Sequence, residues 1–122
     1  MKASRKFALS MLFAAAAAAG TTAAWAHASL QSAEPAKDAE VAAPKEVTLR
    51  FNEKLEAAFS TARVVDGNGK PVTTGKATLD STDPSVMKLA LPPLAPGKYT
   101  VQFVVVGHDG HRRKGEYAFS VK

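Results

Sequence analysis

The residues of this chain best suited to chemistry are its three histidines, and their positions point to metal binding. His27 follows the short segment Ala24-Trp25-Ala26, whereas His108 and His111 both lie in Gly107-His108-Asp109-Gly110-His111. Cysteine is absent, so the chain has no thiolate ligand and no disulfides. A blue-copper electron-transfer site, which requires a cysteine sulfur, is therefore excluded.

The first 26 residues have the pattern of a secretory signal peptide. A basic stretch, Met1–Lys6, precedes an apolar stretch, Phe7–Gly20, which is shorter than the roughly 20 residues needed to span a bilayer. Ala24 and Ala26 supply the Ala-x-Ala pattern accepted by signal peptidase. We expect residues 1–26 to be removed and residues 27–122 to form one exported domain. A cut after Ala28 also fits the pattern and would discard His27.

A histidine at a new N-terminus has a metal-binding option that an internal histidine lacks. Its α-amine and its ring Nδ1 can chelate one ion together in a six-membered ring. Because an α-amine has a pKa of about 7.7–8.0, a divalent ion can displace its proton near neutral pH. Function would then depend on where the precursor is cut.

The second group of candidate ligands follows the longest predicted strand. If the backbone stays extended there, Asp109 and His111 point to one face and His108 points to the other. Gly110 permits a kink between them. We expect Asp109 and His111 to share one ion and His108 to stay outside it, although such a segment can also be ordinary polar surface.

An amine, two imidazoles and one carboxylate favour Cu(II), which binds such ligands more tightly than other divalent ions do. Zinc is a rival for the same set. Met87, the one methionine beyond the leader, falls on the inward face of a predicted strand and is expected to fill the core. Soft ligands for Cu(I) are therefore missing.

Hydrophobicity alternates with a period of two through most of residues 27–122, which predicts an all-β domain. Val47, Leu49 and Phe51 alternate with polar residues, as on a half-buried strand. The strands are expected at Ser29–Ala33, Glu46–Asn52, Ala62–Asp66, Lys76–Asp80, Val86–Leu91 and Tyr99–Val106, with a last strand through Tyr117, Phe119 and Val121, and residues 36–44 as a loop. About seven short strands favour an antiparallel sandwich or barrel.

Two local patterns refine this prediction. In Asp66-Gly67-Asn68-Gly69, both glycines are expected to supply positive φ for a tight turn. Tyr99 follows Leu94-x-x-Gly97 and resembles a tyrosine corner, whose hydroxyl bonds backbone upstream; a plain core tyrosine is the alternative. The apolar residues on both faces of the strand that ends at Val106 predict burial on both sides.

The formal net charge of +5 is no sign of nucleic-acid binding. Three of the 16 basic residues, Lys2, Arg5 and Lys6, lie in the predicted leader. The one basic run of the domain is Arg112-Arg113-Lys114, which fits a solvated face. We expect no nucleic-acid partner and no membrane-embedded segment in the mature domain.

Taken together, residues 27–122 resemble the CopC family of periplasmic copper-resistance and copper-carrier proteins. The matching elements are His27-Ala28-x-Leu30, Ser32-x-x-Pro35, Leu49-x-Phe51-Asn52-Glu53, Leu94-x-Pro96-Gly97-x-Tyr99-x-Val101, Asp109-Gly110-His111 and Gly115-x-x-x-Phe119-x-Val121. The first of these and the Asp-Gly-His element are the most specific.

The resemblance implies a Greek-key β-barrel or sandwich, cupredoxin- or immunoglobulin-like, with seven to nine strands. It implies a Cu(II) site of the histidine-brace type, with His27, Asp109 and His111 as ligands and Glu53 in the outer sphere. Because a methionine-rich Cu(I) site is missing, the chain is similar to the Cu(II)-only members. Gly107-His108 departs from the small or polar pair usual there, and His108 is a candidate weak axial contact.

The function that this resemblance implies is sequestration or delivery of copper in the periplasm, by a monomer that is not an enzyme. A CopD-type inner-membrane protein is the implied receiver. The alternatives are a copper-dependent oxidase or peroxygenase, which would need an open coordination position, and a metal-free β-sandwich used for adhesion or assembly.

Overall fold

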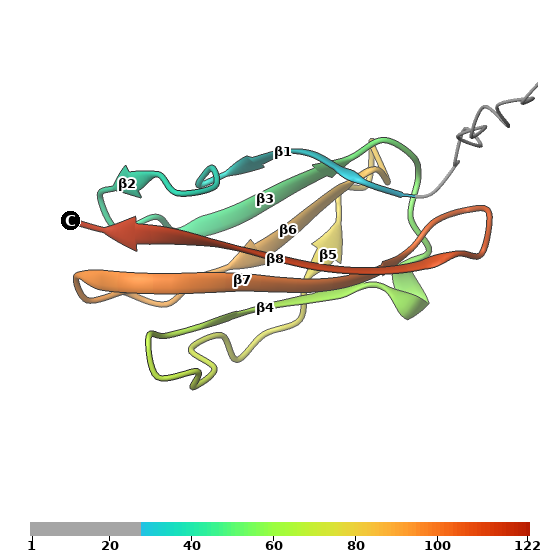
Figure 1. Ribbon diagram of the computed structural model, residues 1–122. Coiled ribbons are helices and arrows are strands. Elements are labelled where there is room, and N and C mark those ends of the chain that lie inside the picture. Colours follow the sequence, from blue (N-terminus) through green and yellow to red (C-terminus); the bar gives the residue numbers. More distant parts are fainter. Residues whose placement is uncertain (1–27) are drawn as a thin grey trace, which may run out of the picture.

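The structure is a computed structural model, and it describes residues 28–122. Eight strands lie within these residues: β1 (Leu30–Glu34), β2 (Glu40–Val41), β3 (Glu46–Phe51), β4 (Thr61–Val65), β5 (Thr78–Leu79), β6 (Val86–Ala90), β7 (Gly97–Val106) and β8 (Arg112–Val121). They form two four-stranded sheets, ordered β1-β3-β6-β5 and β2-β8-β7-β4 (Figure 1). The predicted all-β sandwich is confirmed, and most strand bounds agree with prediction to within two residues.

The first sheet contributes its side of the core through β3 and β6. Val47, Leu49 and Phe51 are at most 2% exposed, as their alternation predicted. Met87 of β6 is 1% exposed and fills the core, also as predicted. The ring of Phe51 meets Phe103 of the other sheet edge-on, with ring centroids 5.4 Å apart. Apolar contact across the two sheets therefore holds the sandwich together.

The long hairpin of β7 and β8 dominates the second sheet. Its inward residues Tyr99, Val101, Phe103 and Val105 are buried. The hydroxyl of Tyr99 donates a hydrogen bond to the carbonyl of Ala95 at 2.7 Å, which confirms the tyrosine corner. The prediction of burial on both faces was wrong: the opposite side of β7 is only half-buried, because no element of residues 28–122 packs over that face.

The turn after β4 forms where it was predicted, but only one of its glycines needs left-handed backbone. Gly69 has φ of 80°, whereas Gly67 is not among the positive-φ residues. The carboxylate of Asp66 accepts the backbone N–H groups of Asn68 and Lys70, both at 2.9 Å. These two bonds lower the pKa of Asp66 below its usual value.

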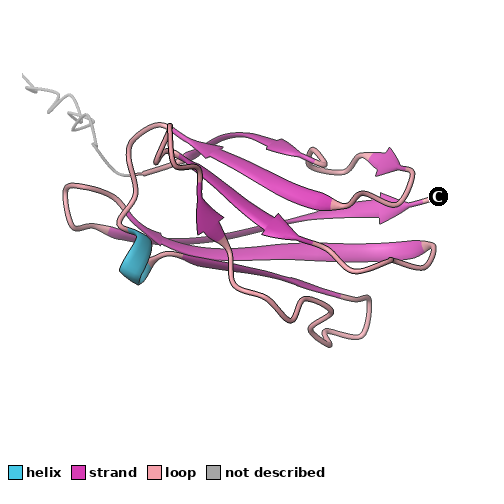
Figure 2. Cartoon of the chain, turned by 180° about the vertical axis from the view of Figure 1, so that it is seen from behind, coloured by secondary structure: helices cyan, strands magenta, loops and turns pink. Residues whose placement is uncertain are grey.

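The segment predicted as a loop at 36–44 contains β2, which pairs in parallel with the end of β8 through Glu40–Ser120 and Val41–Val121. Such a short strand carries no periodicity of its own and is defined by its partner. A short 3₁₀ helix, Ala57–Phe59, connects β3 to β4, and Figure 2 shows it as the cyan turn.

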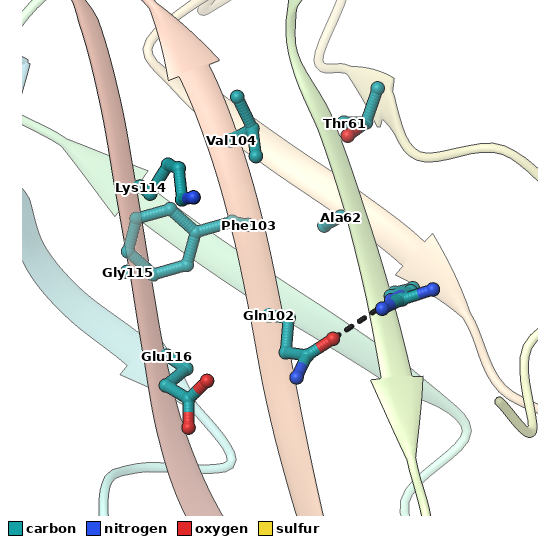
Figure 3. Close-up of a pocket in the computed structure, with 9 residues that line it drawn as sticks. Thr61, Ala62, Gln102, Phe103, Val104, Lys114, Gly115 and Glu116 are labelled. Atoms are coloured by element: carbon teal, nitrogen blue, oxygen red, sulfur yellow. Dashed lines mark hydrogen bonds between the residues drawn. The ribbon is translucent and has the colours of Figure 1, made fainter. Parts of the chain in front are cut away.

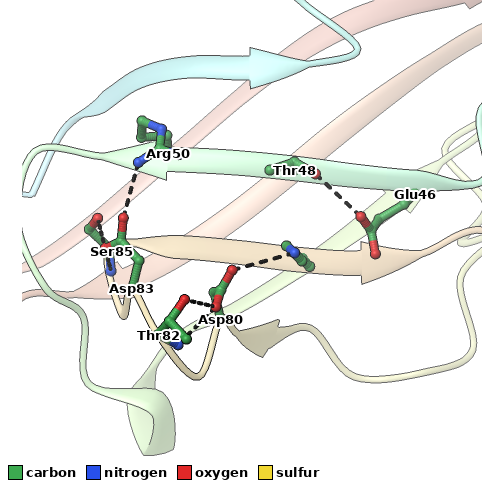
Figure 4. Close-up of polar contacts among 8 residues, drawn as sticks. Glu46, Thr48, Arg50, Asp80, Thr82, Asp83 and Ser85 are labelled. Atoms are coloured by element: carbon green, nitrogen blue, oxygen red, sulfur yellow. Dashed lines mark hydrogen bonds and ion pairs between the residues drawn. The ribbon is translucent and has the colours of Figure 1, made fainter.

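Polar contacts link β3 and β6 of the first sheet to the turn between β5 and β6 (Figure 4). Arg50 of β3 forms an ion pair with Asp83 at 3.1 Å, and Lys88 of β6 forms one with Asp80 at 3.4 Å. Hydrogen bonds from Thr82 lower the pKa of Asp80, and those from Ser85 lower the pKa of Asp83. Within residues 28–122, no helix is long and apolar enough to cross a membrane.

Candidate metal site

Three segments far apart in the sequence meet at one end of the sandwich: the start of the described chain, the residues after β3, and the loop between β7 and β8 (Figure 1). Leu55 pairs with Gly107 in an isolated antiparallel bridge. The N–H of Glu56 donates to the carbonyl of Val106 at 2.8 Å, and the N–H of His108 donates to that of Lys54 at 3.0 Å. Backbone pairing thus fixes the segment after β3 against the loop.

Gly107 is the point at which these segments approach most closely. A Cβ atom added to Gly107 would overlap the carboxylate of Glu53 and would lie 3.3 Å from Oδ1 of Asp109. Glycine is therefore required here to let the two carboxylates converge on the same side of the loop. The sequence alone gave no sign of this contact, because it depends on the pairing of Leu55 with Gly107.

The Glu53 carboxylate has an unusual environment for an acidic side chain near the surface. Its Oε1 is buried and finds no hydrogen-bond partner among residues 28–122. An unpaired buried carboxylate oxygen is costly unless a donor or a cation compensates it. Glu53 is thus not an ordinary exposed carboxylate, and its orphaned oxygen fits a nearby amine, imidazole N–H or metal ion.

The Gly107–His111 loop is a turn, so the expectation of extended backbone there was wrong. The N–H of Gly110 donates to the carbonyl of Gly107 at 2.9 Å, and Gly110 has φ of 83°, the kink that glycine was expected to permit. Oδ1 of Asp109 accepts the backbone N–H of His111 at 2.9 Å. This bond ties Asp109 to His111, in place of the shared strand face that we expected.

The start of the described chain is held beside the same loop. Ala28 is fully buried. The N–H of Ser29 donates to Oδ1 of Asn52 at 2.7 Å, and the N–H of Asn52 donates to the carbonyl of Ser29 at 3.0 Å. Since Asn52 directly precedes Glu53, this pair of bonds brings the chain start next to the orphaned carboxylate.

The predicted ligands are brought together only in part within the described residues. Asp109, His111 and His108 lie in one exposed turn, and Asp109 and Glu53 both approach Gly107. His27 lies outside the described residues. Among residues 28–122, no group of three or more His, Cys, Asp or Glu side chains is arranged to hold a metal ion. Asn52 and Gly107 are the residues that sequence reasoning missed.

Comparison with known proteins identifies the family. The CopC domain matches residues 30–122. The chain is 42% identical over 107 residues to Protein YobA of Escherichia coli strain K12, covering 84% of each chain.

Two solved structures share the fold. The first is CopC from Methylosinus trichosporium OB3b, with a TM-score of 0.75 and 39% identity over 79% of this chain and 94% of that one. The second is PcoC, a methionine-rich copper resistance protein from Escherichia coli, with a TM-score of 0.72 and 35% identity over 80% of this chain and all of that one. The chain therefore belongs to the CopC family of copper-resistance proteins, which bind copper and are not enzymes.

Proposed function

We propose that this protein binds Cu(II) in the periplasm and sequesters it or passes it on. Residues 1–26 are the cleaved leader in this proposal, and residues 27–122 are the copper-binding domain. The ligands are the amine and ring of His27, the carboxylate of Asp109 and the ring of His111. Family membership supports copper as the cargo, and the signal-peptide pattern supports export.

The observation that carries the proposal is the anchoring of the chain start by Asn52, next to Glu53. Consecutive Cα atoms are about 3.8 Å apart. The Cα atom of residue 27 must therefore lie at about that distance from the Cα atom of the buried Ala28. Asn52 and Ser29 hold this end of the chain through hydrogen bonds of 2.7 and 3.0 Å. An N-terminal amine at residue 27 would thus start near Glu53, whose carboxylate approaches Gly107 on the same side as that of Asp109.

In this site Glu53 acts as an outer-sphere group rather than a ligand. Its orphaned Oε1 would accept a hydrogen bond from the metal-bound amine of His27, which would satisfy the oxygen and hold the amine in place. The burial of the Glu53 Oε1 atom supports this role, since a solvated carboxylate oxygen would gain little from such a bond.

The donor set supports Cu(II) rather than Cu(I). Amine, imidazole and carboxylate are the ligands that Cu(II) prefers, while Cu(I) selects thiolates and thioethers. The chain has no cysteine, and Met87 is 1% exposed within the core. The related PcoC is methionine-rich, so we place this protein with the Cu(II)-only members of the family.

The partner in this proposal is a CopD-type inner-membrane protein, which receives copper from the monomeric protein. The amine and ring of His27, the ring of His111 and the carboxylate of Asp109 would together supply four ligands to Cu(II), which would leave little room for a substrate on the ion. The site is therefore suited to carrying copper rather than to oxidising a substrate.

The test is a Cu(II) titration of the exported protein, with its intact mass measured first. We expect a mass that begins at His27, a one-to-one complex, and an electron paramagnetic resonance spectrum with nitrogen couplings. Competition with Zn(II) should leave copper bound. A protein that starts at Ser29, or that binds no copper at micromolar concentration, would refute the proposal.

A further inference from the structure

The outer edge of β8 is open along its first half. β2 covers β8 only at Ser120 and Val121, where the N–H of Ser120 donates to Ala39 and the carbonyl of Ala118 accepts from Asp38. Backbone groups of alternate residues point to the same side of a strand. The N–H and C=O groups of Arg112, Lys114 and Glu116 therefore point to this edge as well, and no described element pairs with them there.

A groove of about 560 Å³ runs along this open edge, between β8 and β1. Its apolar lining includes Leu30, Ala33 and Phe103. The ring of Phe103 lies over Gly115, with ring carbons 2.5–3.1 Å from where a Cβ would stand; Figure 3 shows this pair in a neighbouring pocket, which both residues also line. Glycine at 115 leaves room for that ring. The groove thus offers an apolar floor beside unpaired backbone groups, which is the arrangement that receives an added strand.

The charged residues along the groove are mostly basic. Lys37, Arg113 and Lys114 line it, with Glu116 as the one acidic residue in the lining. Arg112 extends the basic run, and no salt bridge to any of these four basic residues is formed within residues 28–122. An extended segment with acidic side chains would complement this edge, whereas a second copy would bring the same basic run against itself.

We propose that the β8 edge binds an extended acidic segment of a partner protein by strand addition. Acidic side chains of the partner contact Lys37 and Arg112–Lys114, and alternate apolar side chains rest on Phe103. The edge begins directly after His111, so a partner bound here lies beside the candidate metal loop. The inference does not depend on copper being the cargo. Basic residues on an edge can also simply prevent aggregation, and the experiment separates the two roles.

The experiment uses the ¹⁵N-labelled protein and a short capped peptide that alternates glutamate with valine. We expect saturable shifts of the Arg112, Lys114 and Glu116 amides and slower hydrogen exchange at these three positions. The matched peptide of lysine and valine should leave them unchanged. Absent shifts, or equal shifts with both peptides, would overturn the proposal, as would dimerisation of the protein through this edge.

Two variants at one position test the backbone pairing itself. Lys114→Gln removes the charge and keeps the outward N–H, whereas Lys114→Pro also removes that N–H without breaking a bond to β7. Lys114→Pro should bind the glutamate peptide about tenfold more weakly than Lys114→Gln does, since a strand hydrogen bond is lost. Equal affinities of two variants with native amide spectra would contradict strand addition.

Discussion

Asn52 and Ser29 hold each other through a reciprocal pair of hydrogen bonds, from the Ser29 N–H to Oδ1 of Asn52 at 2.7 Å and from the Asn52 N–H to the carbonyl of Ser29 at 3.0 Å. The pair ties the start of the domain to the residue that precedes Glu53. The side-chain amide of Asn52 thereby holds the start of the domain beside Glu53. Glu53 in turn contacts Gly107, in the loop that carries Asp109 and His111.

Asn52→Ala should weaken Cu(II) binding while the protein stays folded. The change removes the acceptor of the Ser29 N–H, so the N-terminal amine loses part of its positioning. The expected loss in affinity is about fivefold, which corresponds to about 1 kcal/mol for one hydrogen bond. Chelator competition measures it. Asn68→Ala, in the distant turn after β4, is the control and should bind as the unaltered protein does; equal affinity for Asn52→Ala would show that this anchor has no role in the site.

Gly107→Ala should disturb both the fold and the site. The added Cβ overlaps the Glu53 carboxylate, which must then move away from Gly107. We expect the free energy of unfolding to fall by about 1–3 kcal/mol, as in other overpacked sites. Urea denaturation measures this. The matched control is Gly75→Ala, where a Cβ meets no atom within 4 Å. Equal free energies of unfolding for the two variants would contradict the prediction, because they would show that Glu53 can move away from Gly107 without destabilising the fold.

Replacing each of the two loop histidines with alanine should change the Cu(II) affinity by very different amounts. His108→Ala should leave Cu(II) affinity nearly intact, since His108 is not among the three proposed ligand residues. His111→Ala should lower it by at least about 100-fold, the upper end of what outer-sphere partners cost. Chelator competition and electron paramagnetic resonance on both variants give the comparison. A large loss for His108→Ala would make that ring a ligand.

Stability should fall in alkali because of Tyr117. Burial raises its pKa from 10.0 to about 12, and its hydroxyl donates to the carbonyl of Pro35 at 2.9 Å. Between these two values the unfolded chain has lost the phenolic proton and the folded chain still holds it, so stability decreases as pH rises from about 10 to about 12. Tyr117→Phe should flatten this dependence. Denaturation at a series of pH values measures it, and unchanged slopes would disprove the role of Tyr117.

The sequence predicted the strands well wherever burial alternates, because one buried face imposes a period of two. Val47, Leu49 and Phe51 show this. The tyrosine corner at Tyr99 could also be predicted, because Leu94 and Gly97 precede it at the typical spacing. β2 was missed because it is only two residues long and is a strand only through its pairing with β8. The geometry of Asp109 and His111 was misjudged because a hydrogen-bonded turn replaced extended backbone. The contact of Glu53 with Gly107 arises only from tertiary pairing, which no local pattern records.

The most direct test of the account compares two forms of the domain that differ only at the α-amine of His27. One form begins with the free amine, and the other carries an N-terminal acetyl group, which removes the amine as a ligand and leaves the ring. The measurement is the Cu(II) dissociation constant by chelator competition. We predict that acetylation weakens binding by at least about 100-fold. Equal affinity of the two forms would contradict a site built on the N-terminal histidine.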